Sequence, residues 1–427
     1  MHIIVVGAGV TGAATALALI GEGHSVEIIE AAPAPATGAS FANAGLVSPG
    51  HCFSWAEPGV VSVALKSLLG FGDGFGIHGP WTGALARWAT LFAREARPER
   101  WLANSRAALA LAGYSRDLQF SANLVLPKSY GGRQDGILYL YGQGQEPGPQ
   151  DASLLQEAGE SFRELDAAML LEREPLLRSA RVTFAKGVYC PGDGTGDAAR
   201  YTAAALEQAV AQGAVVRFAE KVLGFDISHG VARAVHTNHG ERRGDAIVVS
   251  AGLASRRLLA PIGLHLPIHP VTGYSISYRQ GGQARPSVGA VSIAHKVAWA
   301  AFDDTLRFTG FADVGIPSDS TVAKRFAALQ RFAAQVCPDI EALAPQKWVG
   351  QRPMTPDNLP FLGTSPVRNL LLNCGHGAMG WTMACGSARI VSDLIAVRRP
   401  ALDLQPYQWD RYRLLGRRPR QPRSSSR

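Results

Sequence analysis

The chain has 427 residues, of which 47% are apolar and 18% are charged. At roughly 100–200 residues per domain, this length predicts two or three domains, and the apolar share excludes a disordered chain. The five cysteines are odd in number and have no CxxC spacing. They predict neither a disulfide framework nor a metal cluster, and they favour a reducing compartment.

The net charge of +8 is concentrated at the C-terminus. Residues 411–427 hold seven arginines and no acidic residue, so the rest of the chain carries only +1. We interpret this stretch, which contains proline and serine, as a basic disordered tail. The nearly neutral body argues against nucleic acid as a partner, and contact of the tail with anionic lipid or RNA is the alternative.

Residues 3–20 are almost wholly apolar and in this respect resemble a signal-peptide core or a short membrane span. No basic segment precedes them, however, and Gly7, Gly9 and Gly12 interrupt them. No other apolar run reaches about 18 residues, the length of a spanning helix. We therefore expect a cytoplasmic protein, with a peripheral contact to the inner membrane as the alternative.

The first predicted elements form a βαβ unit. Residues 2–6 (HIIVV) are typical of a buried parallel strand, residues 13–23 of a helix, and residues 25–30 of a second strand that ends in Glu30. The glycine-rich turn between strand and helix has the GxGxxG spacing of a dinucleotide site. We assign cofactor contacts to Ile3, Val6, Gly7, Ala8, Gly9, Val10, Thr11 and Gly12.

Each glycine of this turn has a separate physical task. Gly7 permits the tight turn, Gly9 lets a pyrophosphate approach the backbone, and Gly12 allows close helix–strand packing. The helix N-terminus offers free N–H groups to the phosphates. Glu30, 18 residues after Gly12, is placed to accept hydrogen bonds from the adenosine ribose hydroxyls. An acid at this position favours NAD or FAD over NADP.

Residues 37–51 form a loop of small side chains, where a simple NAD domain would have a third strand–helix unit. Ser40, Asn43, Ala44 and Gly45 would let the backbone approach a flat ring and would offer donors to it. An ordinary surface loop is the alternative interpretation. Further along the chain, the patterns predict helices over 81–96, 100–118, 198–212 and 381–397, and strands over 136–141, 215–222, 245–252 and 369–375.

A set of motifs resembles one family. GAGVTG, SFANAGLVSPG, GRQDG, GYS, GQRPMTPD and GHGAMGWTMACGSARIVSDL follow the order seen in FAD-dependent amine oxidoreductases of the D-amino acid oxidase superfamily. The resemblance is strongest to the small-subunit family of bacterial D-amino acid dehydrogenases and covers residues 1 to about 415. It implies FAD, and oxidative deamination of D-amino acids to 2-oxo acids and ammonia by hydride transfer from Cα to flavin N5. The electrons would pass to a quinone or another acceptor.

The resemblance also implies the fold and the domains. We expect an α/β protein with a discontinuous Rossmann-like FAD-binding domain and an α+β substrate domain whose sheet is mainly antiparallel. The predicted boundaries are 1–60, 191–270 and 345–410 for the FAD-binding domain, 61–190 and 271–344 for the substrate domain, and 411–427 for the tail.

Further cofactor contacts follow from the resemblance. Val222 would meet the adenine and Gly252 the pyrophosphate, with plain α/β packing as the alternative for both. The turn 376–380 leads onto a helix N-terminus that can stabilise negative charge at the flavin N1–C2=O locus. We assign this contact to Gly377, Gly380, Trp381 and Thr382, and we interpret His376 as a structural donor rather than a base.

Arg352 is the predicted substrate-carboxylate ligand. A planar guanidinium binds both carboxylate oxygens, and in the family the Arg of this RP motif has that role; a structural salt bridge is the alternative. Tyr274 and Tyr130 are candidates to hydrogen-bond the substrate, with packing as the alternative. His51 stands where the family has Tyr after SPG, which leaves the side-chain preference open.

Three other functions compete with D-amino acid dehydrogenation. The nearest is a D-imino acid (D-proline or hydroxy-D-proline) or glycine/sarcosine-type oxidoreductase, which differs only in pocket residues. A second is an RNA-directed flavoprotein, for which the arginine-rich tail would suit RNA. The third is a non-catalytic flavin-binding subunit, against which Arg352 and the complete glycine turns argue.

Overall fold

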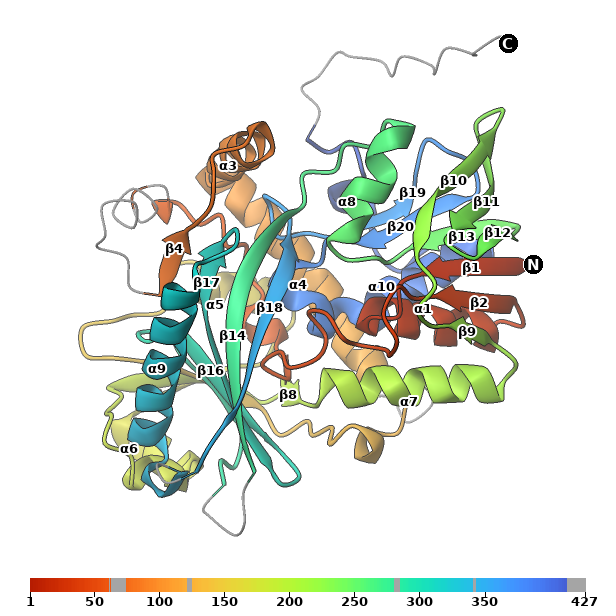
Figure 1. Cartoon of the computed structure of the whole chain (residues 1–427). Helices are drawn as coiled ribbons and strands as arrows, with labels where there is room; N and C mark the ends of the chain where they lie inside the picture. The colour runs from red at the N-terminus through yellow and green to blue at the C-terminus, as the bar shows by residue number, and fades with distance from the viewer. Residues whose placement is uncertain (61, 63–73, 121–124, 280–284, 341–342, 413–427) are drawn as a thin grey trace.

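The computed structural model describes residues 1–60, 62, 74–120, 125–279, 285–340 and 343–412. Within them, two sheets dominate the molecule (Figure 1). The smaller sheet has the strand order β19-β20-β13-β1-β2-β9, and all neighbours are parallel except β19 and β20. Its strands are β1 (His2–Val6), β2 (Ser25–Ile29), β9 (Val215–Arg217), β13 (Ala246–Val249), β19 (Phe361–Thr364) and β20 (Leu370–Cys374).

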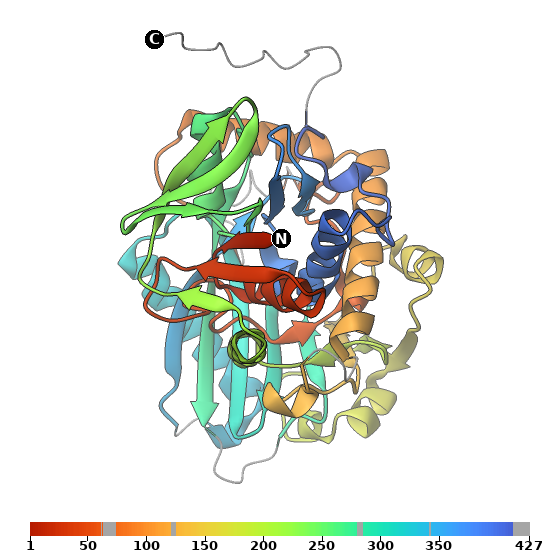
Figure 2. The same cartoon turned by 90° about the vertical axis from the view of Figure 1, so that its right-hand side faces the viewer.

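The smaller sheet is buried on both faces, which explains the continuous apolar run of β1. Ile3 and Val5 pack among helices α1 (Val10–Gly21), α7 (Ala198–Ala211) and α10 (Gly380–Ile395). Ile4 and Val6 point the other way, toward the three-stranded sheet of β10 (Val222–Ser228), β11 (Val231–Thr237) and β12 (Gly240–Arg243). In Figure 2, α10 (blue) lies between α1 (red) and the long helix α4 (orange).

The larger sheet has the order β18-β14-β17-β16-β15-β5-β7-β6, with β4 beside β17. Its pairings are antiparallel except β15–β5 and β17–β4. The strands are β4 (Phe75–Ile77), β5 (Ile137–Tyr141), β6 (Arg163–Asp166), β7 (Lys186–Cys190), β14 (His269–Arg279), β15 (Gly289–Ser292), β16 (Val297–Phe302), β17 (Thr305–Val314) and β18 (Gln346–Met354).

Side-chain alternation gives this sheet one closed and one open face. Tyr274, Ile276 and Tyr278 of β14 are part of the core that packs under helix α9 (Asp319–Val336). Gly273 lies on the opposite face, which borders a cavity toward the smaller sheet. The remaining elements are α3 (Gly83–Glu95), α4 (Pro98–Phe120), α5 (Asp151–Glu157), α6 (Ala167–Arg173), α8 (Ala254–Leu259), β3 (Leu46–Val47), β8 (Gly194–Thr195) and short 3-10 turns that include Pro49–His51 and Gly377–Met379.

The predicted fold class is confirmed: strands from three separate stretches of chain build a mostly parallel sheet, and the second sheet is mainly antiparallel. Two details differ from the sequence prediction. Residues 346–354, which we assigned to the FAD-binding domain, form β18 and pair with β14 in the larger sheet. Helix α4, which we assigned to the substrate domain, packs against α10 beside the smaller sheet.

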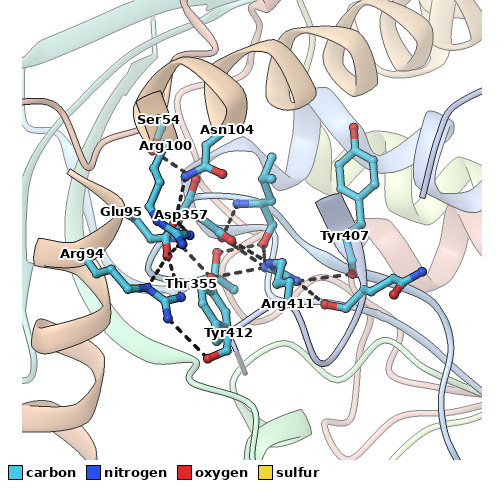
Figure 3. Close-up of polar contacts among 12 residues, drawn as sticks. Ser54, Arg94, Glu95, Arg100, Asn104, Thr355, Asp357, Tyr407, Arg411 and Tyr412 are labelled. Carbon is cyan, nitrogen blue, oxygen red and sulfur yellow. Dashed lines mark hydrogen bonds and ion pairs between the residues drawn. The ribbon is translucent and has the colours of Figure 1, made fainter. Parts of the chain in front are cut away.

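The predicted tail also begins too early. The Arg411 side chain is only 9% exposed and makes the polar contacts drawn in Figure 3, and Tyr412 is buried. Residues 413–427 lie outside the described residues. The Arg411 guanidinium donates to both carboxylate oxygens of Asp357 at 2.6 and 3.1 Å and to the Leu359 carbonyl at 2.7 Å. It also lies 4.0 Å from the centroid of the Phe361 ring. Arg411 thus fixes the loop that leads from β18 in one sheet to β19 in the other.

We expect Arg411→Ala to lower the free energy of unfolding by about 3–5 kcal/mol, because it leaves the buried Asp357 carboxylate without its partner. Urea denaturation at neutral pH measures this loss. The matched control is Arg398→Ala, which breaks ion pairs to Glu22 and Asp393 from a side chain that is 40% exposed, so its loss should be much smaller. Equal losses in the two variants would contradict the role given to Arg411.

Candidate functional site

A cavity of about 1610 Å³ lies between the carboxyl ends of the parallel strands and the open face of the larger sheet. This volume exceeds the 300–1,000 Å³ that is typical of pockets for one small ligand. The cavity therefore has room for a dinucleotide and a second, smaller molecule. Carboxyl ends of parallel strands are also where α/β sheets usually bind their ligands.

The glycine turn after β1 borders one end of the cavity, and its three glycines differ in their surroundings. A Cβ on Gly12 would lie 1.9 Å from the Gly7 carbonyl oxygen, so Gly12 lets α1 pack closely on the turn. Gly7 has a φ of +106°, and a Cβ there would lie 2.7 Å from the Ser250 carbonyl oxygen. A Cβ on Gly9 would meet only Ser40 Oγ, at 3.4 Å. Gly9 is therefore the glycine whose free side faces the cavity.

The structure separates the predicted contacts of this segment into two groups. Val6, Gly7, Gly9, Val10 and Thr11 line the cavity. The other three predicted contacts, at Ile3, Ala8 and Gly12, do not. The first is a core residue, the second donates its amide to a carboxylate, and the third packs on the turn. These three residues support the glycine turn without lining the cavity.

Glu30 lines the cavity at the end of β2. Its two carboxylate oxygens accept hydrogen bonds from the amides of Ala8 and Ala32, at 2.7 and 2.8 Å. These bonds hold the carboxylate in place, and each oxygen keeps a second lone pair for a ligand hydroxyl. The arrangement suits the ribose contact that the sequence predicts.

The neighbouring wall is open. Val222 lines it at the start of β10, and Gly252 has a φ of +51° with no protein atom within 4 Å of the point where a Cβ would lie. Ser250 also contributes to this wall, but its hydroxyl is buried and its Cβ lies 3.6 Å from the point where a Cβ on Gly12 would lie. The open space beside Gly252 therefore leaves room for a ligand at this wall.

Loop 37–51 brings all four of its predicted contacts to the cavity: Ser40, Asn43, Ala44 and Gly45. Ser40 Oγ accepts from the Val10 amide at 3.1 Å, and Asn43 Oδ1 accepts from the Gly45 amide at 2.9 Å. A Cβ on Gly45 would lie 2.0 Å from the Phe302 ring of the larger sheet. The absence of a side chain at residue 45 therefore lets the loop reach this sheet.

The N-terminus of α10 borders the cavity through Gly377, Gly380, Trp381 and Thr382. Thr382 Oγ1 accepts from the Ser48 amide and donates to the Leu46 carbonyl, at 3.2 Å in both cases, which ties the helix to the loop. His376 Nε2 lies 3.2 Å from Ser387 Oγ. Burial lowers the pKa of His376 to about 3, so its ring is neutral and a weak base. The helix dipole is the remaining source of positive potential at this wall.

These features fit a bound dinucleotide. The free faces of Gly9 and Gly252 leave space for phosphates beside the N-terminus of α1, where unpaired amides favour anions. Glu30 supplies a polar group, and the end of α10 supplies positive potential at the opposite end. The described residues contain no cluster of three or more His, Cys, Asp or Glu that could hold a metal ion.

Arg352 lies on β18 at the part of the cavity beyond the glycine turns. Its guanidinium donates to the Phe311 carbonyl at 2.9 Å and lies 5.8 Å from the centroid of the Trp55 ring. A Cβ on Gly273 would lie 2.4 Å from Arg352 Nη2, so only glycine leaves room for the guanidinium at that position. Within the described part of the chain, no carboxylate lies within 4.0 Å of it.

Burial lowers the pKa of Arg352 to about 10, and the charges of Asp313 and Tyr274 act in the opposite direction. The guanidinium therefore stays positive at neutral pH. A largely buried cation without a counter-ion is unfavourable unless a ligand neutralises it. The site thus has the chemistry to bind a carboxylate.

The two predicted tyrosines are not at the cavity. The Tyr274 hydroxyl donates to Asp313 Oδ2 at 2.6 Å in the core under α9. Tyr130 is fully buried, its hydroxyl donates to the Gln119 carbonyl at 3.4 Å, and its ring packs edge-on against Trp381. Neither side chain lines the cavity, because strand alternation and local packing turn them away from it. In both cases the packing alternative describes the observed side chain.

His51 does line the cavity, and it lies beside Tyr139, which the sequence did not single out. Its ring centroid lies 4.9 Å from that of Tyr139, and the Tyr139 hydroxyl donates to the buried Asp193 at 2.6 Å. Burial, with a smaller effect of Lys296, lowers the pKa of His51 to about 4. His51 is therefore a neutral, aromatic part of the wall at physiological pH.

Sequence reasoning missed Trp55, Tyr139, Gly273 and Phe311 as cavity residues. Only Gly273 carried a usable signal, since an isolated glycine inside a strand often marks a close approach of another group. Trp55 follows the recognised SPG segment without any motif of its own. Tyr139 and Phe311 look like ordinary strand aromatics.

Comparisons with known proteins agree with this geometry. The family described as FAD dependent oxidoreductase matches residues 2–394. The D-amino acid dehydrogenase of Rhizorhabdus wittichii is 35% identical over 421 residues, which cover 96% of this chain and 100% of that protein. The D-amino acid dehydrogenase of Phenylobacterium zucineum is 35% identical over 412 residues, which cover 95% and 96% of the two chains.

Solved structures share the fold. The crystal structure of glycine oxidase from Geobacillus kaustophilus has a TM-score of 0.70 at 24% identity and covers 96% of this chain and 98% of its own. L-proline dehydrogenase from P. horikoshii has a TM-score of 0.71 at 18% identity, with 96% and 97% covered. The family match over residues 2–394 and a cavity that fits a dinucleotide lead to one conclusion: this chain belongs to the FAD-dependent oxidoreductases and uses FAD as its cofactor.

Proposed function

We propose that the protein oxidatively deaminates D-amino acids to 2-oxo acids and ammonia. The observation that carries the proposal is Arg352, a largely buried cation at the cavity with no carboxylate partner among the described residues. The D-amino acid dehydrogenases that match this chain over nearly its whole length support the substrate class. Family membership supports the redox chemistry.

FAD, when bound, supplies the acceptor for the hydride that leaves the substrate Cα. The chain itself binds and orients the substrate. Arg352 holds the carboxylate, and the Trp55 ring and the Phe311 carbonyl limit the directions that its guanidinium can take. Positioning of this kind makes a large contribution to rate.

The proton balance needs no strong base from the protein. A substrate whose amino group is neutral loses a hydride from Cα and a proton from nitrogen, and the resulting imino acid is hydrolysed to the 2-oxo acid and ammonia. His51 and His376 have pKa values of about 4 and about 3 because of burial. Both rings are therefore uncharged, and they add no positive charge that would oppose loss of the hydride.

We further propose that electrons leave to a lipophilic acceptor such as a quinone at a membrane surface. Near the cavity, Phe41, Trp55 and Val349 are at least 36% exposed, and Phe41 lies 6.2 Å from the Trp348 ring that lines it. Such apolar surface supports contact with a lipophilic molecule. Among the described residues, no helix is long and apolar enough to cross a membrane, so this contact would be peripheral.

Anaerobic reduction tests the activity. Purified holoenzyme receives D-alanine, L-alanine, D-proline or sarcosine separately, and the visible flavin absorbance is followed. We expect bleaching with D-alanine and none with L-alanine. Bleaching with D-proline or sarcosine but not D-alanine would replace the proposal by an imino-acid or glycine-type oxidoreductase. A yellow protein that none of the four reduces would contradict an amine oxidoreductase.

Arg352→Ala should raise KM for D-alanine roughly 10- to 150-fold, because it removes a charge-assisted interaction of about 1.5–3 kcal/mol. FAD content should stay unchanged. Arg352→Lys keeps the charge but loses the planar fork, so we expect an intermediate KM. Steady-state kinetics with a fixed artificial acceptor measure both variants. Wild-type KM in Arg352→Ala would remove this residue from the site.

Gly9→Val should give a folded protein without FAD. The space beside Gly9 is open within the protein itself, whereas a bound pyrophosphate would need it. The flavin absorbance per mole of purified protein measures the loss, and circular dichroism checks the fold. Gly21→Val is the control, since its Cβ also meets no protein atom within 4 Å but it lies at the far end of α1. A fully yellow Gly9→Val protein would show that the turn does not bind the pyrophosphate.

A further inference from the structure

Strand β17 carries a β-bulge where it passes β14. Thr272 lies opposite Asp313 and Tyr274 lies opposite Gly310, so that two residues of β17 face one residue of β14. One of these two, Phe311, has a φ of +64°. A bulky side chain in this left-handed region is a conformational outlier. It persists only when the surrounding structure holds it, and such residues cluster at functional sites.

The bulge has a direct consequence at the cavity. It directs the Phe311 carbonyl oxygen to Arg352 Nη1, at 2.9 Å. This hydrogen bond is the only one that the described part of the protein makes to the Arg352 guanidinium, which lies over Gly273. The one hydrogen bond that orients Arg352 therefore comes from the backbone of a strained residue.

Asp313 holds the bulge from the other side of the sheet. It is fully buried and accepts from the Tyr274 hydroxyl at 2.6 Å and from Arg325 at 2.7 and 3.1 Å. His78 lies just beyond β4, and its Nε2 is 3.2 Å from Asp313 Oδ1. One carboxylate thus connects β14, α9 and the chain after β4 at the residue that follows the bulge.

The same network touches Phe311 directly. The Arg325 guanidinium, fixed by Asp313, lies 4.9 Å from the centroid of the Phe311 ring. The Tyr274 ring lies 6.3 Å from it. Two of the three partners of Asp313, Arg325 and Tyr274, therefore restrain the side chain whose backbone is in the left-handed region. Asp313 itself does not line the cavity.

We propose that Asp313 is a positioning residue for the substrate-carboxylate site: it holds the Phe311 bulge, whose carbonyl oxygen orients the Arg352 guanidinium. The inference rests on the proposed function, because it takes Arg352 as the carboxylate ligand. It assigns Tyr274 a role through Asp313 instead of the direct substrate contact expected from the sequence. Arg325 takes part in the same way, since it neutralises Asp313 and covers the Phe311 ring.

The test is Asp313→Asn in the FAD-loaded enzyme. Pyruvate serves as a carboxylate probe, and its Kd is read from the change in the visible flavin spectrum; KM and kcat for D-alanine are measured in parallel. We expect FAD content to stay at the wild-type level, and the pyruvate Kd and the D-alanine KM to rise together by about tenfold. The fall in kcat should be smaller than either rise.

Asp357→Asn is the matched control, because Asp357 also forms a buried pair with an arginine and does not line the cavity. It should lose stability without a change in pyruvate Kd or KM. Tyr274→Phe keeps the ring and removes only one bond to Asp313, so it should fold even where Asp313→Asn does not. It should raise both constants about two- to fivefold.

Unchanged Kd and KM in Asp313→Asn, or in Tyr274→Phe where the first variant yields no holoenzyme, would overturn the proposal. Pyruvate binding to Arg352→Ala distinguishes the role of Arg352 as carboxylate ligand from the positioning role of Asp313. Loss of pyruvate binding there, together with unchanged binding in the Asp313 and Tyr274 variants, leaves the carboxylate ligand in place and removes only the positioning role. Unchanged pyruvate binding in Arg352→Ala would refute the proposed function itself.

Discussion

The antiparallel pairing of β18 with β14 is the constraint on which the site depends. Nine consecutive residue pairs, from His269 with Met354 to Ser277 with Gln346, join the two strands. This pairing brings a late segment of the chain to the edge of the larger sheet and places the Arg352 guanidinium over Gly273. A shift of one residue in register would turn Arg352 to the face covered by α9, because side chains alternate along a strand.

A second constraint returns the chain from this strand to the smaller sheet. Directly after β18, Asp357 and Leu359 are held by Arg411, which comes from the end of the described chain. The loop therefore cannot move independently of the C-terminal segment. Because Asp357 and Leu359 do not line the cavity, this constraint acts on the connection between the sheets and not on the site itself.

Several buried carboxylates in the described part of the chain pair with arginines. Asp357 pairs with Arg411, Asp313 with Arg325, and Asp197 with Arg307. Such pairing is expected, since an unpaired buried charge is strongly destabilising. Arg352 has no carboxylate partner in the described part of the chain, and it is the arginine that lines the cavity between Trp55 and Phe311. We propose that a bound carboxylate supplies the missing charge there.

By itself, the sequence determined the features that depend on short stretches of chain. The GxGxxG turn, the strand before it and Glu30 could be placed because glycine stereochemistry and apolar periodicity act over a few residues. Arg352 could be chosen because it lies in a short RP motif that resembles the family's, and a planar guanidinium suits a carboxylate. The tertiary structure decided the rest. Tyr274 and Tyr130 face away from the cavity, Arg411 pairs with the buried Asp357, and a bulge brings the Phe311 carbonyl oxygen to Arg352. Each of these outcomes depends on partners distant in sequence, and no local pattern specifies which face of a strand such a partner will cover.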